Sequence, residues 1–176
     1  VTLIARGKHL EAIRKNGLTI QKLWDESRET LPVKACTAEE YKEIPDVILV
    51  CIKGYSMDET VPTIKKIAGK ETVVIPILNI YGTGGRLQKK LPELTVTDGC
   101  IYVSANILEP GVILQHGKIL RVVFGARKPE EETEKMREVA KDMVTDDLEV
   151  ILSENIRRDA MVKFSYVSPI GAAGLY

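Results

Sequence analysis

Runs of apolar residues alternate with amphipathic stretches along this chain, and the strongest run is VILVCI at residues 47–52. It follows Pro45 and Asp46 and ends at Lys53. A strand that is apolar on both faces is typical of the centre of a parallel sheet that helices cover on both sides. The pattern therefore predicts a buried central strand here.

A helix and a second apolar strand follow this run. Residues 56–70 have helical spacing, with Ser56 or Asp58 as the N-cap and Gly69 as the stop. Residues 71–79 (ETVVIPILN) predict the second buried strand. Strand, helix and strand within about 30 residues make a βαβ unit with a right-handed crossover. The pattern predicts an α/β fold with a doubly wound parallel sheet.

The first residues also combine strand and helix signals. VTLIARG (residues 1–7) predicts a strand, which must pair with another because an isolated strand leaves its backbone groups unsatisfied. A short helix follows from about His9 to Gly17, since Gly17 stands where a helix ends in a left-handed turn. Residues 18–37 then predict a polar-tipped hairpin.

Beyond the second apolar strand, stretches with helical spacing of the apolar residues alternate with stretches in which apolar residues recur about every two positions, as in strands. The predicted elements are a short helix at 84–93, strands in hairpins at 96–124, an amphipathic helix at 128–147 that begins with Pro129, and a last strand at 148–156. Residues 157–176 have the small residues and apolar spacing of a tightly packed helix.

Composition places the chain among ordinary globular proteins, since 44% of its 176 residues are hydrophobic. The 25 basic and 25 acidic side chains cancel, so no overall field favours a nucleic acid or an anionic membrane as a partner. No apolar segment approaches the ~18 residues of a membrane span, and the first residues do not have the charged-then-apolar pattern of a leader, so we expect no secretion. We therefore expect no nucleic-acid partner and no membrane association.

The cysteines and histidines fit neither a disulfide framework nor a metal site. Cys36, Cys51 and Cys100 are an odd number at wide spacings. His9 and His116 have no carboxylate or second histidine at metal-ligand spacing. We expect reduced, buried or half-buried cysteines, surface histidines, no metal ion and a cytoplasmic protein.

Polar residues at the ends of the predicted strands are the candidates for chemistry, because doubly wound α/β folds bind ligands beyond the carboxyl ends of their strands. Arg6 ends the first strand, where a basic residue accommodates the 2′-phosphate of NADP; the alternative is a solvated strand end. Lys53 and Asn79 end the two apolar strands, and we expect both to reach one crevice. The alternative for Lys53 is an edge lysine whose ammonium extends to solvent.

Lys163 is the candidate for proton transfer. It lies on the last predicted helix among apolar side chains, which are Met161, Phe164, Tyr166 and Val167. An ammonium in such a setting loses solvent, and desolvation lowers the pKa of a lysine toward the range useful for proton transfer. The alternative is a lysine on the helix surface.

The glycines of YGTGGR (residues 81–86) lack the spacing of a phosphate-binding loop. We interpret Gly82, Gly84 and Gly85 as turn formers that let the backbone approach a ligand.

Four segments together resemble the ketopantoate reductase family (2-dehydropantoate 2-reductase), NADPH-dependent enzymes of pantothenate and coenzyme A biosynthesis: VTLIARG, DVILVCIKGY, ILNIYGTG and NIRRDAMVKFSYVSPIGAAG. The resemblance implies a Rossmann-like NADP-binding domain over residues 1–155 and the first helix of an all-α C-terminal domain over residues 156–176. It also implies that Val1 begins the second strand of the family, so that the glycine-rich loop is missing and the chain alone is inactive.

The resemblance implies roles for the candidate residues. Arg6 resembles the arginine that meets the 2′-phosphate, Lys53 the lysine at the cofactor ribose, and Asn79 the asparagine near nicotinamide and substrate. Ile80 stands where the family usually has glycine. Lys163 resembles the catalytic lysine of the family's Trp-x-Lys pattern.

Three positions near that lysine depart from the pattern. Met161 stands where tryptophan is usual, and Val167 and Gly171 stand where members that form pantoate commonly have asparagines. In the family those asparagines help bind ketopantoate, so these departures affect the identity of the substrate more than the type of reaction. A related 2-oxo acid is therefore an alternative to ketopantoate.

The function expected from the resemblance is reduction of a 2-oxo acid by NADPH, with a small-molecule substrate and a homodimer as a candidate assembly. The alternative is a non-catalytic nucleotide-binding or interaction module on the same fold.

Overall fold

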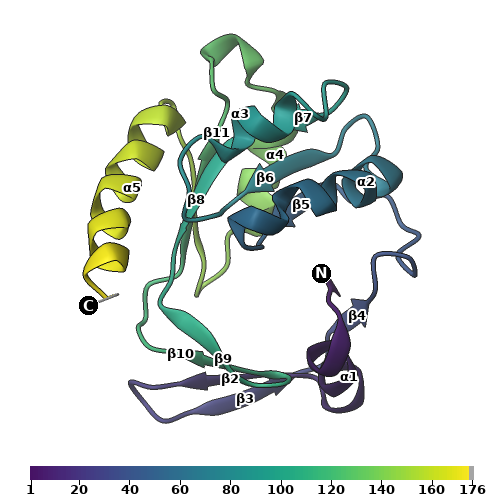
Figure 1. Cartoon of the computed structure of the whole chain (residues 1–176), viewed down its shortest axis with the longest axis vertical. Coiled ribbons are helices and arrows are strands. Elements are labelled where there is room, and N and C mark those ends of the chain that lie inside the picture. The colour runs from purple at the N-terminus through teal and green to yellow at the C-terminus, as the bar shows by residue number, and fades with distance from the viewer. Residues whose placement is uncertain (175–176) are drawn as a thin grey trace. The chain divides into compact units, whose positions relative to one another are not determined.

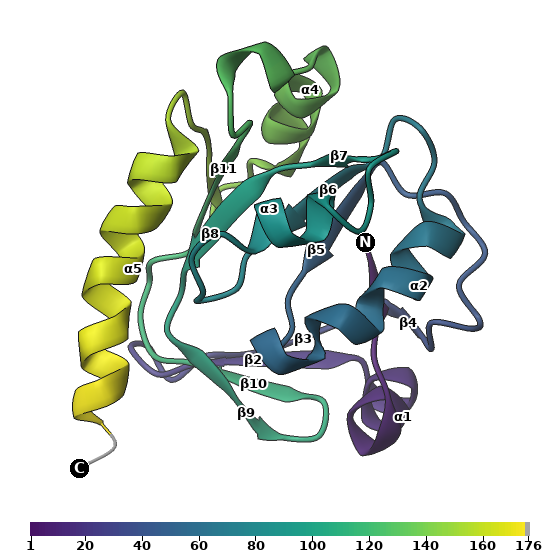
Figure 2. The same cartoon turned by 45° about the horizontal axis from the view of Figure 1, so that its top comes forward.

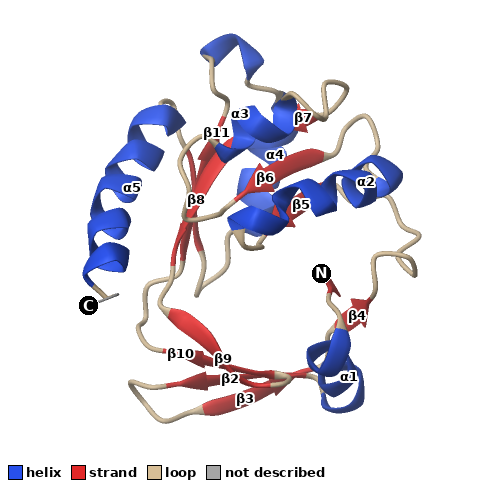
Figure 3. Ribbon diagram, viewed as in Figure 1, coloured by secondary structure: helices blue, strands red, loops and turns tan. Residues whose placement is uncertain are grey.

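The computed structural model describes residues 1–174, and these divide into two compact units. The first unit consists of Val1–Glu43 and Val103–Ile119, and the second of Ile44–Tyr102 and the chain from Leu120 onward. Each unit has its own strands and helices (Figure 3). The last residues of the predicted C-terminal helix, Leu175 and Tyr176, lie outside the described residues.

The second unit contains the predicted βαβ unit. Strand β5 (Val47–Val50) leads through helix α2 (Met57–Ile67) to strand β6 (Val73–Pro76), and the two strands pair in parallel. Strand β7 (Thr95–Val96) pairs in parallel with the other edge of β6. The α/β prediction is confirmed, and β6 is the central strand of this sheet.

The expectation that residues 47–52 form the central strand is wrong. Among the described residues β5 pairs on one side only, and Leu49 is 40% exposed. Side chains alternate between the faces of a strand, so Val47, Leu49 and Cys51 share one face. Only Val47 at the start of that face packs against a core cluster. Cys51 is therefore exposed, against the expectation that all three cysteines are buried or half-buried.

Helices cover both faces of the sheet of the second unit (Figure 1). One face packs against α2 and helix α3 (Thr83–Gln88) through an apolar cluster of Val50, Met57, Ile64, Val74, Leu78, Leu87, Leu91 and Val96. The other packs against helix α4 (Glu134–Met143) through Val73, Ile75, Ile77, Val122, Phe124, Met136 and Val139. All four residues of β6 are buried because they lie between these two layers.

Helix α4 begins later than predicted. Pro129 starts a separate 3₁₀ turn (Pro129–Glu131), and α4 begins at Glu134 after the N-cap Thr133. The Thr133 hydroxyl accepts a hydrogen bond from the backbone N–H of Met136 at 3.3 Å, which satisfies one of the free donors of the first turn.

A second three-stranded sheet completes this unit. Strand β11 (Arg121–Gly125) pairs in parallel with β12 (Glu149–Leu152) and antiparallel with β8 (Asp98–Tyr102). Gly99 lets β8 approach β6 closely, because a Cβ at this position would lie 3.0 Å from the Pro76 carbonyl oxygen.

Helix α5 (Ile156–Ala173) runs beside β8 and β11 (Figure 2). It begins where the predicted helical domain begins, and the domain boundary at residue 156 stays a prediction. Only Ile156 and Lys163 of this helix are buried among the residues that the structure describes. The expectation of a tightly packed helix is therefore wrong: α5 packs along one side, and Met161, Tyr166 and other apolar side chains are exposed.

The first unit contains a two-stranded and a four-stranded sheet. Strand β1 (Thr2–Ile4) pairs in parallel with β4 (Lys34–Cys36). The other sheet has the order β3 (Arg28–Leu31), β2 (Leu18–Lys22), β10 (Val112–Gln115) and β9 (Ala105–Glu109). The predicted hairpin at 18–37 thus ends with β3. Its last residues form β4 instead, which is the pairing partner of β1.

Helix α1 (Gly7–Asn16) connects β1 to this hairpin. Its apolar face buries Leu10 and Ile13, and Gly17 ends it with φ of +81°, as the pattern predicts. His9 was expected on the surface, but its Nδ1 accepts a hydrogen bond from the backbone N–H of Gly111 at 3.0 Å. This histidine therefore joins α1 to the turn between β9 and β10.

Candidate active site

A pocket of the second unit lies beyond the carboxyl end of β6, between β8 and α5. The loop after β6 contributes one wall, the first residues of β8 the second, and one face of α5 the third. The lining residues are Leu78, Asn79, Ile80, Tyr81, Gly99, Cys100, Ala160, Lys163, Phe164 and Val167. Asn79, Tyr81, Cys100 and Lys163 bring side chains with polar groups, and the rest of the lining is apolar or glycine.

Lys163 and Asn79 meet in this pocket. The Lys163 ammonium donates a hydrogen bond to Asn79 Oδ1 at 2.6 Å, although the two residues are 84 positions apart in the sequence. Lys163 is 6% exposed, whereas Asn79 is exposed in the loop between β6 and α3. Two of the sequence-predicted site residues thus form one polar pair at the edge of a buried region.

The Lys163 ammonium lies in an environment that disfavours its charge. Burial lowers the pKa of Lys163 below the ordinary value of a lysine, and only the negative charge of an ionised Cys100 thiolate would act in the opposite direction. The hydrogen-bond acceptor is a neutral amide, which stabilises an ammonium less than a carboxylate would. A lysine in this state gives up its proton more readily than one in water, so the pair is suited to proton donation.

The other two predicted residues, Lys53 and Arg6, do not line this pocket. Lys53 follows β5 and is exposed; it precedes the short 3₁₀ turn Gly54–Ser56 and is not among the residues that line the pocket. Arg6 belongs to the first unit, where it is exposed and directly precedes α1. No side chain caps the N-terminus of α1, and its first turn contains no acidic residue.

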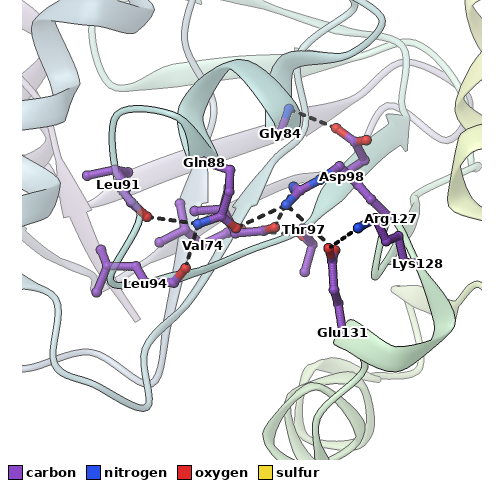
Figure 4. A network of polar contacts seen from close by, with 11 residues as sticks. Val74, Gly84, Gln88, Leu91, Leu94, Thr97, Asp98, Arg127, Lys128 and Glu131 are labelled. Carbon is purple, nitrogen blue, oxygen red and sulfur yellow. Dashed lines mark hydrogen bonds and ion pairs between the residues drawn. The ribbon is translucent and has the colours of Figure 1, made fainter.

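The glycines of residues 82–85 have different roles. Gly82 has φ of +76° and starts α3, as expected of a turn former. Gly84 makes a close approach to the protein itself rather than to a ligand: a Cβ there would lie 2.0 Å from the Thr97 carbonyl oxygen. Its N–H donates to Asp98 Oδ1 at 2.8 Å (Figure 4). This contact attaches α3 to the start of β8.

A further set of polar contacts holds the other end of α3 (Figure 4). The Arg127 guanidinium donates to the Val96 carbonyl oxygen at 2.7 Å and to Gln88 Oε1 at 3.0 Å. The Gln88 amide nitrogen in turn donates to two backbone carbonyl oxygens, those of Leu91 and Leu94, each at 2.9 Å. Both ends of α3, and with them the loop that carries Asn79, are therefore tied to the sheet.

Sequence reasoning missed the β8 side of the site. Cys100 and Tyr102 are two residues apart on β8, so they share a face, and the Tyr102 ring centroid lies 5.5 Å from Lys163 Nζ. Phe164 was identified, but not its ring contact with Tyr81, whose centroid is 6.3 Å away. The two-residue period of β8 was visible, but it does not say which helix covers this face.

The described residues contain neither a candidate membrane-spanning helix nor a candidate metal-binding cluster. None of the helices in residues 1–174 is both long and apolar enough to span a bilayer. No group of three or more His, Cys, Asp or Glu side chains in the same residues could hold a metal ion.

Comparison with known proteins agrees with this α/β architecture. The family model for ketopantoate reductase PanE/ApbA matches residues 1–129. The chain is 32% identical over 177 residues to the 2-dehydropantoate 2-reductase of Pyrococcus horikoshii, which covers 98% of this chain and 55% of that protein. The chain thus spans about half the length of the curated relatives it matches.

Solved structures have the same fold. The 2-dehydropantoate 2-reductase from Porphyromonas gingivalis W83 matches with a TM-score of 0.87 at 30% identity, over 100% of this chain and 61% of that one. The ternary structure of D-mandelate dehydrogenase with NADH and anilino(oxo)acetate has a TM-score of 0.78 at 20% identity, over 91% and 51% of the two chains, which shows likeness of fold alone. With its Rossmann-like α/β fold, and with most of its length matched by the family model, the chain belongs to the ketopantoate reductase family.

Proposed function

We propose that the protein containing this chain reduces a 2-oxo acid, ketopantoate or a related compound, with NADPH as the reductant. The observation that carries this proposal is the hydrogen bond between Lys163 and Asn79 in the pocket at the end of β6. Membership of the family supports the reaction type. Roles in pantothenate and coenzyme A biosynthesis and in the cytoplasm follow from the same proposal, and the homodimer stays a prediction.

Each unit has residues suited to one part of an NADPH molecule. In the first unit, the exposed Arg6 guanidinium and the N–H groups at the start of α1 suit the 2′-phosphate, since helix N-termini bind anions. In the second unit, Lys53 and Asn79 follow neighbouring parallel strands and would suit the ribose and nicotinamide. When bound, NADPH supplies the hydride.

The side chains of the pocket would act on the carbonyl group of the substrate. Lys163 Nζ donates a proton to the carbonyl oxygen as negative charge develops there, and Asn79 Oδ1 orients the ammonium while this happens. The low exposure of Lys163 keeps water from competing for that proton.

The apolar part of the pocket bears on which 2-oxo acid is reduced. Ile80, Phe164 and Val167 line it beside the polar pair, and none of them offers a hydrogen bond to a substrate hydroxyl. We therefore expect 2-oxo acids with apolar side chains to give a higher kcat/KM than ketopantoate in the full-length protein. In a panel of both kinds with NADPH, a clear preference for ketopantoate would contradict this expectation, and no turnover of any member would leave the non-catalytic module as the better proposal.

Substitution of Arg6 tests the cofactor. Arg6→Asp is expected to weaken NADPH binding by about 10- to 100-fold and to leave NADH binding nearly unchanged, because a charged hydrogen bond to the 2′-phosphate is lost. Fluorescence titration of the full-length protein with each cofactor measures both affinities.

Lys15→Asp is the matched control, since Lys15 is an exposed cation near the other end of α1. It changes the net charge by the same amount and is expected to leave both affinities within a fewfold of wild type. Equal losses in the two variants, or an unchanged NADPH affinity in Arg6→Asp, would remove Arg6 from the cofactor site.

A further inference from the structure

Tyr102 is the last residue of β8, and it lies outside the lining of the pocket. Its ring centroid is 5.5 Å from Lys163 Nζ. The ring is half-buried and packs against the small apolar cluster of Cys100, Val123 and Ile156 beneath α5. Its place is therefore set by β8 and this cluster, independently of Lys163.

The Lys163 ammonium needs a source of electrostatic stabilisation beyond Asn79. An ammonium has three N–H donors, and the hydrogen bond to Asn79 uses one of them. The face of an aromatic ring has negative electrostatic potential, and a cation within about 6 Å of the centroid is attracted to it, more strongly where water is excluded. The distance from Lys163 to Tyr102 lies within that range.

The other charged and titratable groups near this contact either have partners of their own or are neutral. Asp159, one turn earlier on α5, accepts a hydrogen bond from the Ser153 hydroxyl at 2.6 Å. Arg121 on β11 lies 5.9 Å from the same Tyr102 ring and is paired with Glu149 at 2.5 Å. Cys100 on β8 is buried, which raises the pKa of its thiol and keeps it neutral. While the Cys100 thiol is neutral, the Tyr102 ring is the group on β8 placed to favour the charged ammonium.

We propose that Tyr102 is a positioning residue of this site, whose ring face holds the Lys163 ammonium in its charged form and against Asn79. The effect of the ring on the charge of Lys163 is inferred from the geometry alone. The effect of Tyr102 on turnover rests on the proposed reduction of a 2-oxo acid. Loss of the ring would leave a buried ammonium with a single amide acceptor, so the neutral amine would be favoured.

Tyr102→Leu removes the ring, and Tyr102→Phe keeps the ring while removing the hydroxyl. The titration of Lys163 is followed by NMR in full-length protein labelled in its lysine side chains, with the signal assigned by its absence in Lys163→Arg. In Tyr102→Leu we expect the titration to move to lower pH by about half a unit or more, because the ring face that attracts the cation is lost. In Tyr102→Phe we expect it to stay close to wild type.

An unchanged titration in Tyr102→Leu would overturn the inference. So would equal shifts in the Leu and Phe variants, because the hydroxyl rather than the ring would then be responsible. If Tyr102→Leu does not fold, Tyr102→Trp replaces it. Tryptophan attracts a cation more strongly than tyrosine does, so the titration of Lys163 is expected to move to higher pH. No shift, or a shift to lower pH, would reject the proposal. The alkaline limit of kcat should move with the titration, but the titration alone decides the inference even if no 2-oxo acid is reduced.

Discussion

Replacement of Lys163 with alanine is expected to lower kcat for 2-oxo acid reduction by about 10²- to 10⁴-fold in the full-length protein, which is the usual contribution of a positioned general acid. The physical reason is that the carbonyl oxygen would then take its proton from water. The buried position of Lys163 makes the loss larger, because the surroundings that would remain hold little water to substitute for the ammonium. Steady-state kinetics with saturating NADPH measure kcat directly.

Arg157→Ala is the matched control, since Arg157 is an exposed cation in the first turn of α5, the same helix. It removes one positive charge from the helix and is expected to keep kcat within about twofold of wild type, as for a surface substitution. A Lys163→Ala protein that binds NADPH normally and retains kcat within a fewfold of wild type would show that Lys163 is not the proton donor.

The pH dependence of kcat follows from the state of Lys163. In the proposed mechanism the protonated form of Lys163 is the donor, so we expect activity to be retained below its pKa in the enzyme and to fall as the pH rises through that pKa. Because burial lowers this pKa, the alkaline loss is expected to begin below the pH at which an exposed lysine titrates. A pH–rate profile of the wild-type protein checks the direction.

Gly84→Ala is expected to lower the free energy of unfolding by about 3 kcal/mol, at the upper end of the usual cost of overpacking. The added methyl carbon would lie 2.0 Å from the Thr97 carbonyl oxygen and 2.4 Å from Asp98 Oδ1. Both atoms belong to the junction of β7 and β8, which the packed sheet prevents from moving away. Relief would require α3 to shift and its hydrogen bond to Asp98 to break (Figure 4). Urea denaturation measures the loss.

The adjacent glycine provides the control. In Gly85→Ala the nearest atom to the new Cβ would be Arg127 Cδ at 4.0 Å, so no clash arises. Within a helix, alanine is favoured over glycine by about 0.5–1 kcal/mol, and we expect a small gain in stability. Similar effects of the two substitutions, in either direction, would mean that the close approach at Gly84 does not constrain α3.

Local patterns predicted the elements that depend on neighbouring residues. The βαβ unit β5–α2–β6 follows from two apolar runs with a helical stretch between them, and α1 follows from the spacing of Leu10 and Ile13 before Gly17. Arg6, Lys53 and Asn79 could be named because a residue that ends a parallel strand is placed by that strand alone. Lys163 could be named from its apolar neighbours and from the family resemblance.

Pairings between distant segments could not be predicted in this way. Strand β4 leaves its hairpin to pair with β1, and β10 pairs in parallel with β2, although neither segment differs in composition from an ordinary hairpin strand. The exposure of Leu49 depends on which layers cover β5, and α4 covers only the start of that face. Apolar content shows that a segment can be buried, but the arrangement of the other layers decides whether it is.

The amino-acid sequence by itself determined the α/β class and the family, and it supplied the candidate residues for the chemistry. The tertiary structure decided which of these residues meet. It places Lys163 of α5 against Asn79, 84 positions away, with Tyr102 of β8 beside the ammonium. The reason is that periodicity reports each residue's place within its own helix or strand, whereas contact between α5, β8 and the loop after β6 depends on how their apolar faces pack together.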